Sequence, residues 1–222
     1  MELIATYRNP GLCQLADAVC DFYARRHDLH RPGLSFGGEG ERPDKRSTDI
    51  SLVWLDRSDA EAHGLADTIM RAVAGGLKQY LAERPLLMQV CPERSLFINP
   101  LFNIQHYAPG EGFVAWHCDW STEHDATEPI TRVLAWILYC NDIDNAGTEF
   151  HWQQHHVEAQ RGQLAIFPAG ISHVHRGRVS NVASKTIATG WINAGSLDTY
   201  LQRLSTDNDN DNDNDNDNDN RR

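Results

Sequence analysis

The sequence predicts a mainly β fold, an antiparallel sandwich or barrel with helices supplied by the first third of the chain. After Pro85 the spacing of apolar residues changes from the 3.6-residue period of helices to the two-residue period of strands. Turn residues separate the segments that follow this second pattern, and many short strands joined by turns are typical of sandwiches and barrels. The expected strands are residues 102–107, 112–118, 132–140, 147–152, 163–167, 172–176 and 185–193.

The first third of the chain is expected to contain two amphipathic helices. From Pro10 to about His27, and again over residues 59–84, apolar residues recur at spacings of three and four. The apolar positions are Leu12, Leu15, Ala16, Val19, Phe22 and Tyr23 in the first helix, and Leu65, Ile69, Val73, Leu77 and Leu81 in the second. Between the helices, residues 49–55 alternate as a strand does. Residues 30–48 are rich in Gly, Pro and charge and are expected to form a mobile surface segment.

Length and composition indicate one domain followed by a low-complexity tail. At 222 residues and 25.0 kDa the chain is long enough for one sizeable core. We expect a single domain over residues 1–204, with helical support over about 1–90 and a β core over about 97–193. Residues 205–222 consist mostly of an Asp-Asn repeat that cannot bury apolar area, so we expect this tail to be disordered.

Charge and cysteine usage exclude several classes of protein. The formal net charge is -11, and no clustered basic face is evident, so we expect no nucleic-acid partner. The five cysteines form no CxxC pair, which favours reduced thiols in a cytoplasmic protein. No leader pattern is present and no apolar stretch approaches the length of a membrane span, so we expect neither secretion nor a membrane partner.

His117 and Asp119 are the first candidate metal ligands. They lie two residues apart, so both would point to one face of a strand, although such a pair alone is common in surface turns. Two histidines and one carboxylate would leave positions open on a non-haem Fe(II) centre. Downstream, His173 and His175 could both face inward as the third ligand. A basic residue that could hold an oxo-acid, Lys185, lies ten residues after His175, which favours His175.

Several further elements accompany these residues in the same order. Tyr107 lies ten residues before His117, and Gly190 and Trp191 follow Lys185. The intervening motifs are "LYCND" (138–142), "AGTEF" (146–150) and "GQLAIFPAG" (162–170). Because these residues and motifs occur in this order and spacing, residues 97–193 resemble the Fe(II)/2-oxoglutarate-dependent oxygenases, and most closely the prolyl 4-hydroxylase group. The resemblance implies a double-stranded β-helix, that is, a jelly-roll or cupin-like barrel.

The resemblance also implies roles for individual residues. His117, Asp119 and His175 would be the catalytic iron ligands. Lys185 would pair with the distal carboxylate of 2-oxoglutarate, a position at which many relatives carry Arg. The remaining residues implied to surround the co-substrate are Tyr107 and Tyr139, as hydroxyl donors, and Ile137 and Trp191, as walls of the pocket.

The implied activity is a dioxygenase reaction that uses Fe(II), 2-oxoglutarate and O2, with ascorbate as an optional reductant. The products would be succinate, CO2 and a hydroxylated substrate: a prolyl or other peptidyl residue, an amino acid or a small molecule. Asp119 disfavours halogenation, because halogenases of this type lack the carboxylate ligand. Two other classes stay open, a cupin-like metal-binding isomerase or sensor and an interaction module with incidental histidines. Residues 30–48 and 121–129 are the expected rims of the pocket, one of them ordering over the substrate.

The remaining histidines, Cys118 and Arg132 are assigned other roles. His173 could contact His175 or the substrate, or could be a solvated strand residue. His151, His155 and His156 are expected to be turn and surface residues without a carboxylate partner. Cys118 should face away from the ligands and pack in the core. Arg132 is expected to cap its strand, with a substrate contact as the minority alternative.

Overall fold

The computed structural model describes residues 3–33, 44–91, 95–120 and 131–202. The expected disorder of 205–222 and the expected rim 121–129 lie outside these residues, as do positions 34–43 of the other expected rim. In the described ranges no helix is long and apolar enough to cross a membrane. All five cysteines are unpaired.

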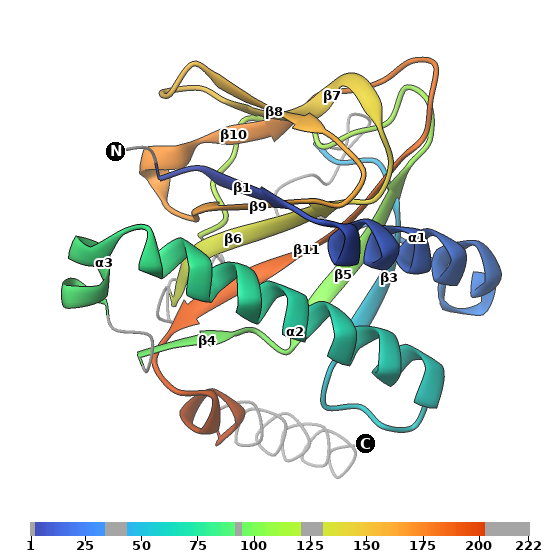
Figure 1. Cartoon of the computed structure of the whole chain (residues 1–222). Helices are drawn as coiled ribbons and strands as arrows, with labels where there is room; N and C mark the ends of the chain where they lie inside the picture. Colours follow the sequence, from blue (N-terminus) through green and yellow to red (C-terminus); the bar gives the residue numbers. More distant parts are fainter. Residues whose placement is uncertain (1–2, 34–43, 92–94, 121–130, 203–222) are drawn as a thin grey trace, which may run out of the picture.

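The strands form two stacked sheets, so the predicted antiparallel fold is confirmed (Figure 1). The larger sheet has the order β1-β9-β6-β11-β5-β3-β2, with β4 also paired to β11. The smaller sheet has the order β10-β7-β8. The bounds are β1 Ala5–Arg8, β2 Arg31–Pro32, β3 Thr48–Val53, β4 Leu96–Ile98, β5 Leu101–Tyr107, β6 Arg132–Tyr139, β7 Ile143–Phe150, β8 His155–Ala159, β9 Gln163–Pro168, β10 His175–Gly177 and β11 Lys185–Ala194. The sheets face each other and do not close into a continuous barrel.

Helices α1 (Pro10–Arg25) and α2 (Ala60–Ala82) cover one face of the larger sheet, and the short α3 (Pro85–Val90) follows α2 (Figure 1). Asn9 caps α1 by accepting the N–H of Leu12, and Asp59 caps α2 by accepting the N–H of Ala62. The predicted apolar stripes are buried, apart from a half-buried Leu65. Both helices were therefore predicted correctly, and burial of their stripes stabilises them against the sheet.

Alternation along the central strands divides the core into two compartments. On β6, Trp136 and Leu138 point toward the helices, whereas Ile137 and Tyr139 point toward the smaller sheet. The compartment between the sheets, which we call the inner compartment, is lined by Ile4, Tyr107, Ala135, Ile137, Tyr139, Ile143, Ala146, Phe150, Val157, Ala159, Ala165, Phe167, Ala169 and Ile187. Because side chains alternate strictly along a strand, residues two apart on β6 and β11 share this compartment.

Two strand predictions were wrong. Residues 112–118 form no strand: after the positive-φ Gly110 the segment makes only isolated bridges, from Phe113 to Lys45 and from His117 to His175. The expected strand 172–176 was wrong in its first half. Residues Ile171–His173 form a 3-10 turn, and β10 begins only at His175, which pairs with β7. The expectation of a mobile segment over 30–48 was also partly wrong, since β2 pairs with β3 and Lys45 is buried.

Candidate metal centre

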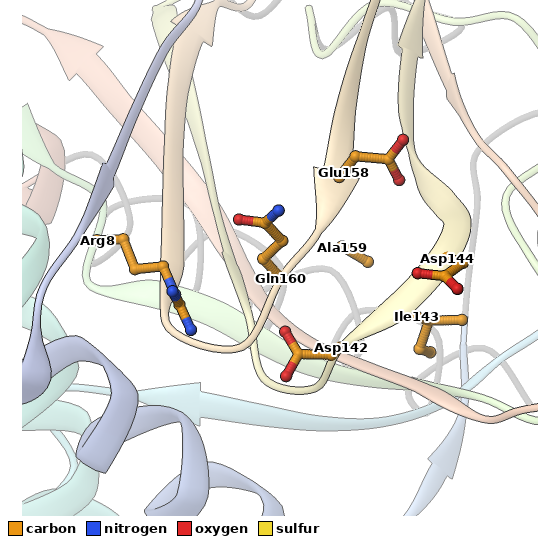
Figure 2. A pocket seen from close by; sticks show the side chains of 7 residues that line it. All are labelled: Arg8, Asp142, Ile143, Asp144, Glu158, Ala159 and Gln160. Carbon is orange, nitrogen blue, oxygen red and sulfur yellow. The ribbon is translucent and has the colours of Figure 1, made fainter.

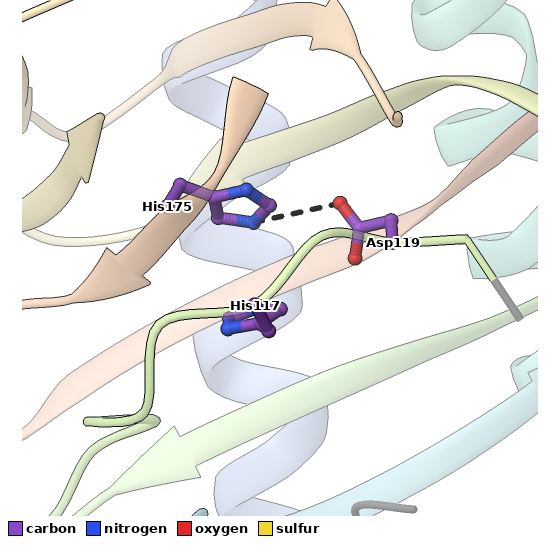
Figure 3. A group of neighbouring side chains, drawn as sticks. All are labelled: His117, Asp119 and His175. Carbon is purple, nitrogen blue, oxygen red and sulfur yellow. Dashed lines mark ion pairs between the residues drawn. The ribbon is translucent and has the colours of Figure 1, made fainter. Parts of the chain in front are cut away.

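The structure brings His117, Asp119 and His175 together at the edge of the inner compartment (Figure 3). His117 and His175 exchange backbone hydrogen bonds of 3.0 and 2.8 Å, which aligns the segment after β5 with the start of β10. Asp119 follows two residues later, and its Oδ2 lies 3.5 Å from Nε2 of His175. One candidate ligand atom from each residue lies within 4.8 Å of the others. This is the arrangement expected of three side chains that share one ion.

Hydrogen bonds fix the tautomer of both histidines. Nδ1 of His117 lies 2.9 Å from the carbonyl of Ala115, and Nδ1 of His175 lies 2.9 Å from the carbonyl of His173. A carbonyl only accepts, so both Nδ1 atoms carry the proton and donate. Each Nε2 is therefore left with a lone pair that can bind a metal ion. With the Asp119 carboxylate, the donor set fits Fe(II).

The electrostatic environment keeps His117 neutral. Burial, followed by the neighbouring His175, lowers the pKa of His117 from 6.5 to about 4. Phe113 stacks on the His117 ring with centroids 3.7 Å apart, and Phe150 and Phe167 pack around His175. None of these aromatic contacts was predicted from the sequence. A neutral imidazole at pH 7 is the form that binds metal.

No second cluster of this kind is found in the described ranges, where these three residues form the only group of three or more potential metal ligands. His151 is exposed in the β7–β8 turn, as predicted. His156 is half-buried and its Nδ1 lies 3.1 Å from Glu158, so the expectation that it lacks a carboxylate partner was wrong. His173 is buried, and Ser172 Oγ lies 3.0 Å from its Nδ1, which excludes a solvated strand position.

Lys185 is a buried cation on the wall of the inner compartment. Its side chain is 5% exposed and its Nζ donates to the carbonyls of Ala146 and Arg178, each at 2.8 Å. Among the described residues no carboxylate forms an ion pair with it. Burial lowers the pKa of Lys185 from 10.5 to about 8. A buried ammonium that lacks a counter-ion is costly, so the site favours an anionic ligand.

The four other predicted pocket residues border the same compartment. Tyr107, the cross-strand partner of Lys185, lies with its ring centroid 5.1 Å from Nζ of Lys185. Tyr139 and Ile137 are buried on β6, and the partly buried Trp191 packs against the compartment. The hydroxyl of Tyr107 donates to Gln105 Oε1 at 2.7 Å, and that of Tyr139 lies 2.6 Å from Thr148 Oγ1. Gln105 and Thr148 were missed, although Thr148 lies in the quoted motif "AGTEF". Burial raises the pKa of both phenols, so each stays a hydrogen-bond donor.

Arg132 and Cys118 lie close to the triad. Arg132 Nη1 donates to the backbone carbonyl of Asp119 at 3.2 Å, and its guanidinium carbon lies 3.6 Å from the ring centroid of Trp191. The interpretation of Arg132 as a strand cap is therefore incomplete. Cys118 is only half-buried, so the prediction that it packs in the core was wrong. It lies in the segment that makes only isolated bridges.

A separate cleft is lined by residues at the start of β7 and the end of β8 (Figure 2). Its polar side chains are those of Arg8, Asp142, Asp144, Glu158 and Gln160. Asp142 accepts the N–H of Arg161 and Glu158 accepts the N–H of Asn145. These carboxylates thus take part in turn hydrogen bonds, and none of the candidate ligands lines this cleft.

Residues 102–193 match the family model described as the 2OG-Fe(II) oxygenase superfamily. A search of the curated proteins found no match. Several solved structures are similar over most of their length. The viral collagen prolyl hydroxylase of Paramecium Bursaria Chlorella virus-1, in a 2OG complex, has a TM-score of 0.58 and 13% identity, covering 87% of this chain and 97% of that chain.

Two other prolyl hydroxylases give similar values. The Pseudomonas putida prolyl-4-hydroxylase has a TM-score of 0.57 and 17% identity, covering 86% of this chain and 92% of that chain. The prolyl hydroxylase of Trichoplax adhaerens, in complex with a hypoxia inducible factor peptide fragment, has a TM-score of 0.60 and 10% identity. The match covers 87% of this chain and 83% of that chain. At these identities the likeness shows a shared fold, the double-stranded β-helix, and the fold prediction is confirmed.

Proposed function

We propose that this chain is an Fe(II)- and 2-oxoglutarate-dependent dioxygenase that hydroxylates a prolyl or other peptidyl residue, because residues 102–193 match the family model of the 2OG-Fe(II) oxygenase superfamily. The observation that carries the proposal is the pairing of two features around one compartment. A His-Asp-His set lies at its edge, and a buried, anion-seeking lysine lies on its wall. An oxygenase that uses an oxo-diacid needs both, whereas a simple metal-binding protein needs only the first.

In this proposal His117, Asp119 and His175 hold Fe(II) through two Nε2 atoms and a carboxylate. Lys185 pairs with the distal carboxylate of 2-oxoglutarate, and Tyr107 and Tyr139 turn their hydroxyls from Gln105 and Thr148 toward the co-substrate. Ile137 and Trp191 exclude water from the compartment, as their packing with its apolar residues suggests. When bound, the metal with its co-substrate would activate O2 and couple release of succinate and CO2 to hydroxylation.

Consumption of 2-oxoglutarate tests the reaction class. The parent protein with Fe(II) and O2 should form succinate, and adding Fe(II) and 2-oxoglutarate anaerobically should give a weak visible charge-transfer band. His117→Ala and His175→Ala should lose both signals, because each removes a ligand. His151→Ala is the matched control, since this histidine is exposed in a turn, and it should behave as the parent does. Tight metal binding with neither succinate nor the absorption band would favour the cupin-like metal-binding alternative.

The substrate is tested separately. Similarity to prolyl hydroxylases, one of them with a bound peptide, supports a peptide substrate over a free amino acid or another small molecule. Mass spectrometry of proline-containing peptides incubated with the enzyme should detect the gain of one oxygen atom. Oxidation of amino acids or other small molecules in the same screen, with no peptide oxidised, would contradict the peptide assignment and leave the dioxygenase assignment standing.

We also propose that the enzyme works in the cytoplasm and does not act on nucleic acid. The five unpaired cysteines support a reducing compartment. The formal net charge of -11 offers no attraction to a phosphate backbone. Fractionation of cells that express the intact protein would check the compartment, and a filter-binding assay at low salt would check nucleic acid.

A further inference from the structure

Asp119 lies in a segment that no strand ladder holds in place. Its N–H donates to the carbonyl of Ala169 at 2.9 Å, and His117 is fixed by its paired hydrogen bonds with His175. In the part of the chain that the structure describes, no backbone N–H donates to the carbonyl of Asp119. The backbone contacts therefore fix the histidine from both sides but hold Asp119 from one side only.

Arg132 provides the contact on the other side. Its Nη1 donates to the carbonyl of Asp119 at 3.2 Å, while its guanidinium carbon lies over the indole of Trp191, 3.6 Å from the ring centroid. Arg132 starts β6 and is paired with Asn193 of β11, so it and Trp191 come from neighbouring strands of the larger sheet. The guanidinium thus connects the loop that carries Asp119 to the rigid sheet.

The chemistry of arginine suits this contact. A guanidinium can stack on an aromatic ring through its face and donate hydrogen bonds from its edge at the same time, and a lysine ammonium cannot. The position of the Asp119 carboxylate depends on the main chain at its own Cα, because the side chain is short. A contact that fixes the peptide unit after Asp119 therefore limits where the carboxylate can lie relative to His117 and His175.

We propose that Arg132, supported by Trp191, is a positioning residue that orients Asp119 for metal binding. The inference rests on the proposed function only in that the three residues bind a divalent metal ion. Groups that orient a metal ligand without touching the metal typically affect metal affinity by about 10- to 100-fold when they are removed. An effect of that size is expected here, with no contribution from 2-oxoglutarate or substrate.

The test uses Co(II) added to metal-free, full-length protein, with absorption spectra and calorimetry as readouts. Arg132→Met keeps an apolar stem but removes the donors, and it should bind Co(II) about 10- to 100-fold more weakly, with an altered d–d spectrum. Arg132→Lys keeps a hydrogen-bond donor but loses the planar contact with Trp191, so its Co(II) affinity should lie between those of Arg132→Met and the parent. Unchanged thermal unfolding of the metal-free variants would exclude a general loss of structure.

Arg176 provides a matched control. Its guanidinium also stacks on a tryptophan, Trp116, at 4.3 Å, and it pairs with Glu149, yet it donates no hydrogen bond to a candidate ligand. Arg176→Met should bind Co(II) as the parent does. Parent-like affinity and spectrum in Arg132→Met would overturn the inference, as would an equal loss in both arginine variants. If His175→Ala itself bound Co(II) as tightly as the parent, the metal site of the proposed function would fail instead.

Discussion

Replacing Lys185 with methionine should remove a pH-dependent part of the stability of the protein. Lys185 is 5% exposed and lacks a carboxylate partner in the described ranges, and burial lowers its pKa from 10.5 to about 8. Below pH 8 both the folded and the unfolded state carry the proton, so this group adds no pH dependence. Between about 8 and 10.5 the unfolded state binds more protons than the folded state, and the free energy of unfolding rises with pH.

The size of this rise follows from the pKa shift. One pKa unit corresponds to about 1.4 kcal/mol, so the full shift amounts to about 3 kcal/mol. Other groups titrate in the same range: burial raises the pKa of Tyr7 and of Tyr80 to about 12, which acts in the opposite direction. The informative quantity is therefore the difference between the parent and Lys185→Met at each pH.

Urea unfolding of both proteins, metal-free, at pH values from about 7 to about 10 measures that difference. The free energy of unfolding of the parent relative to Lys185→Met should rise by roughly 2–3 kcal/mol across this range. Loss of the hydrogen bonds to Ala146 and Arg178 shifts the variant by a constant amount and leaves the slope unaffected. Lys78→Met, at an exposed position of α2, should follow the parent. Parallel curves for the parent and Lys185→Met would refute the assignment of a lowered pKa to this buried lysine.

Three further substitutions test other parts of the structure. Phe113→Ala should raise the pKa of His117 from about 4 toward its ordinary value, because the stacked ring contributes to its burial; an unchanged midpoint in an NMR titration of the metal-free protein would contradict this. Tyr139→Phe should weaken 2-oxoglutarate binding several-fold in a calorimetric titration and cost about 1 kcal/mol of stability, because Thr148 loses its partner; full co-substrate affinity would argue against a hydroxyl contact. Gly190→Ala should destabilise the protein by about 1–3 kcal/mol in urea, because its Cβ would lie 2.8 Å from Phe102 and 2.9 Å from Trp136, whereas Gly75→Ala on α2 meets nothing within 4 Å and should be neutral or stabilising.

The local features of the fold could be predicted from the sequence. The helices α1 and α2 follow from apolar residues three and four apart next to Asn9 and Asp59, which cap them. Strands β5, β6, β9 and β11 were predicted from apolar segments separated by turn residues; each is paired on both sides, and β6 and β9 are buried on both faces. Short strands such as β1 and β8 were missed, since four or five residues carry little periodic signal.

The segment 112–118 shows where local pattern fails. Its residues alternate as a strand does, but a strand also needs a partner along its length, and here only Phe113 and His117 find one. His173 and His175 differ for the same reason. The spacing allowed both to face inward, and the 3-10 turn at Ile171–His173 places only His175 on a strand next to His117.

The sequence by itself determined the residue types of the site and their order: His117 and Asp119 two apart, His175 downstream, and Lys185 ten residues later. These could be read from residue type and order alone, although the strand expected to carry His117 and Asp119 does not form. Only the tertiary structure decided how they are supported. Three contacts join residues far apart in the chain: the backbone pair between His117 and His175, the hydrogen bond from Lys185 to the carbonyl of Ala146, and the contact of Arg132 with both Asp119 and Trp191. No local pattern encodes which distant strands will meet.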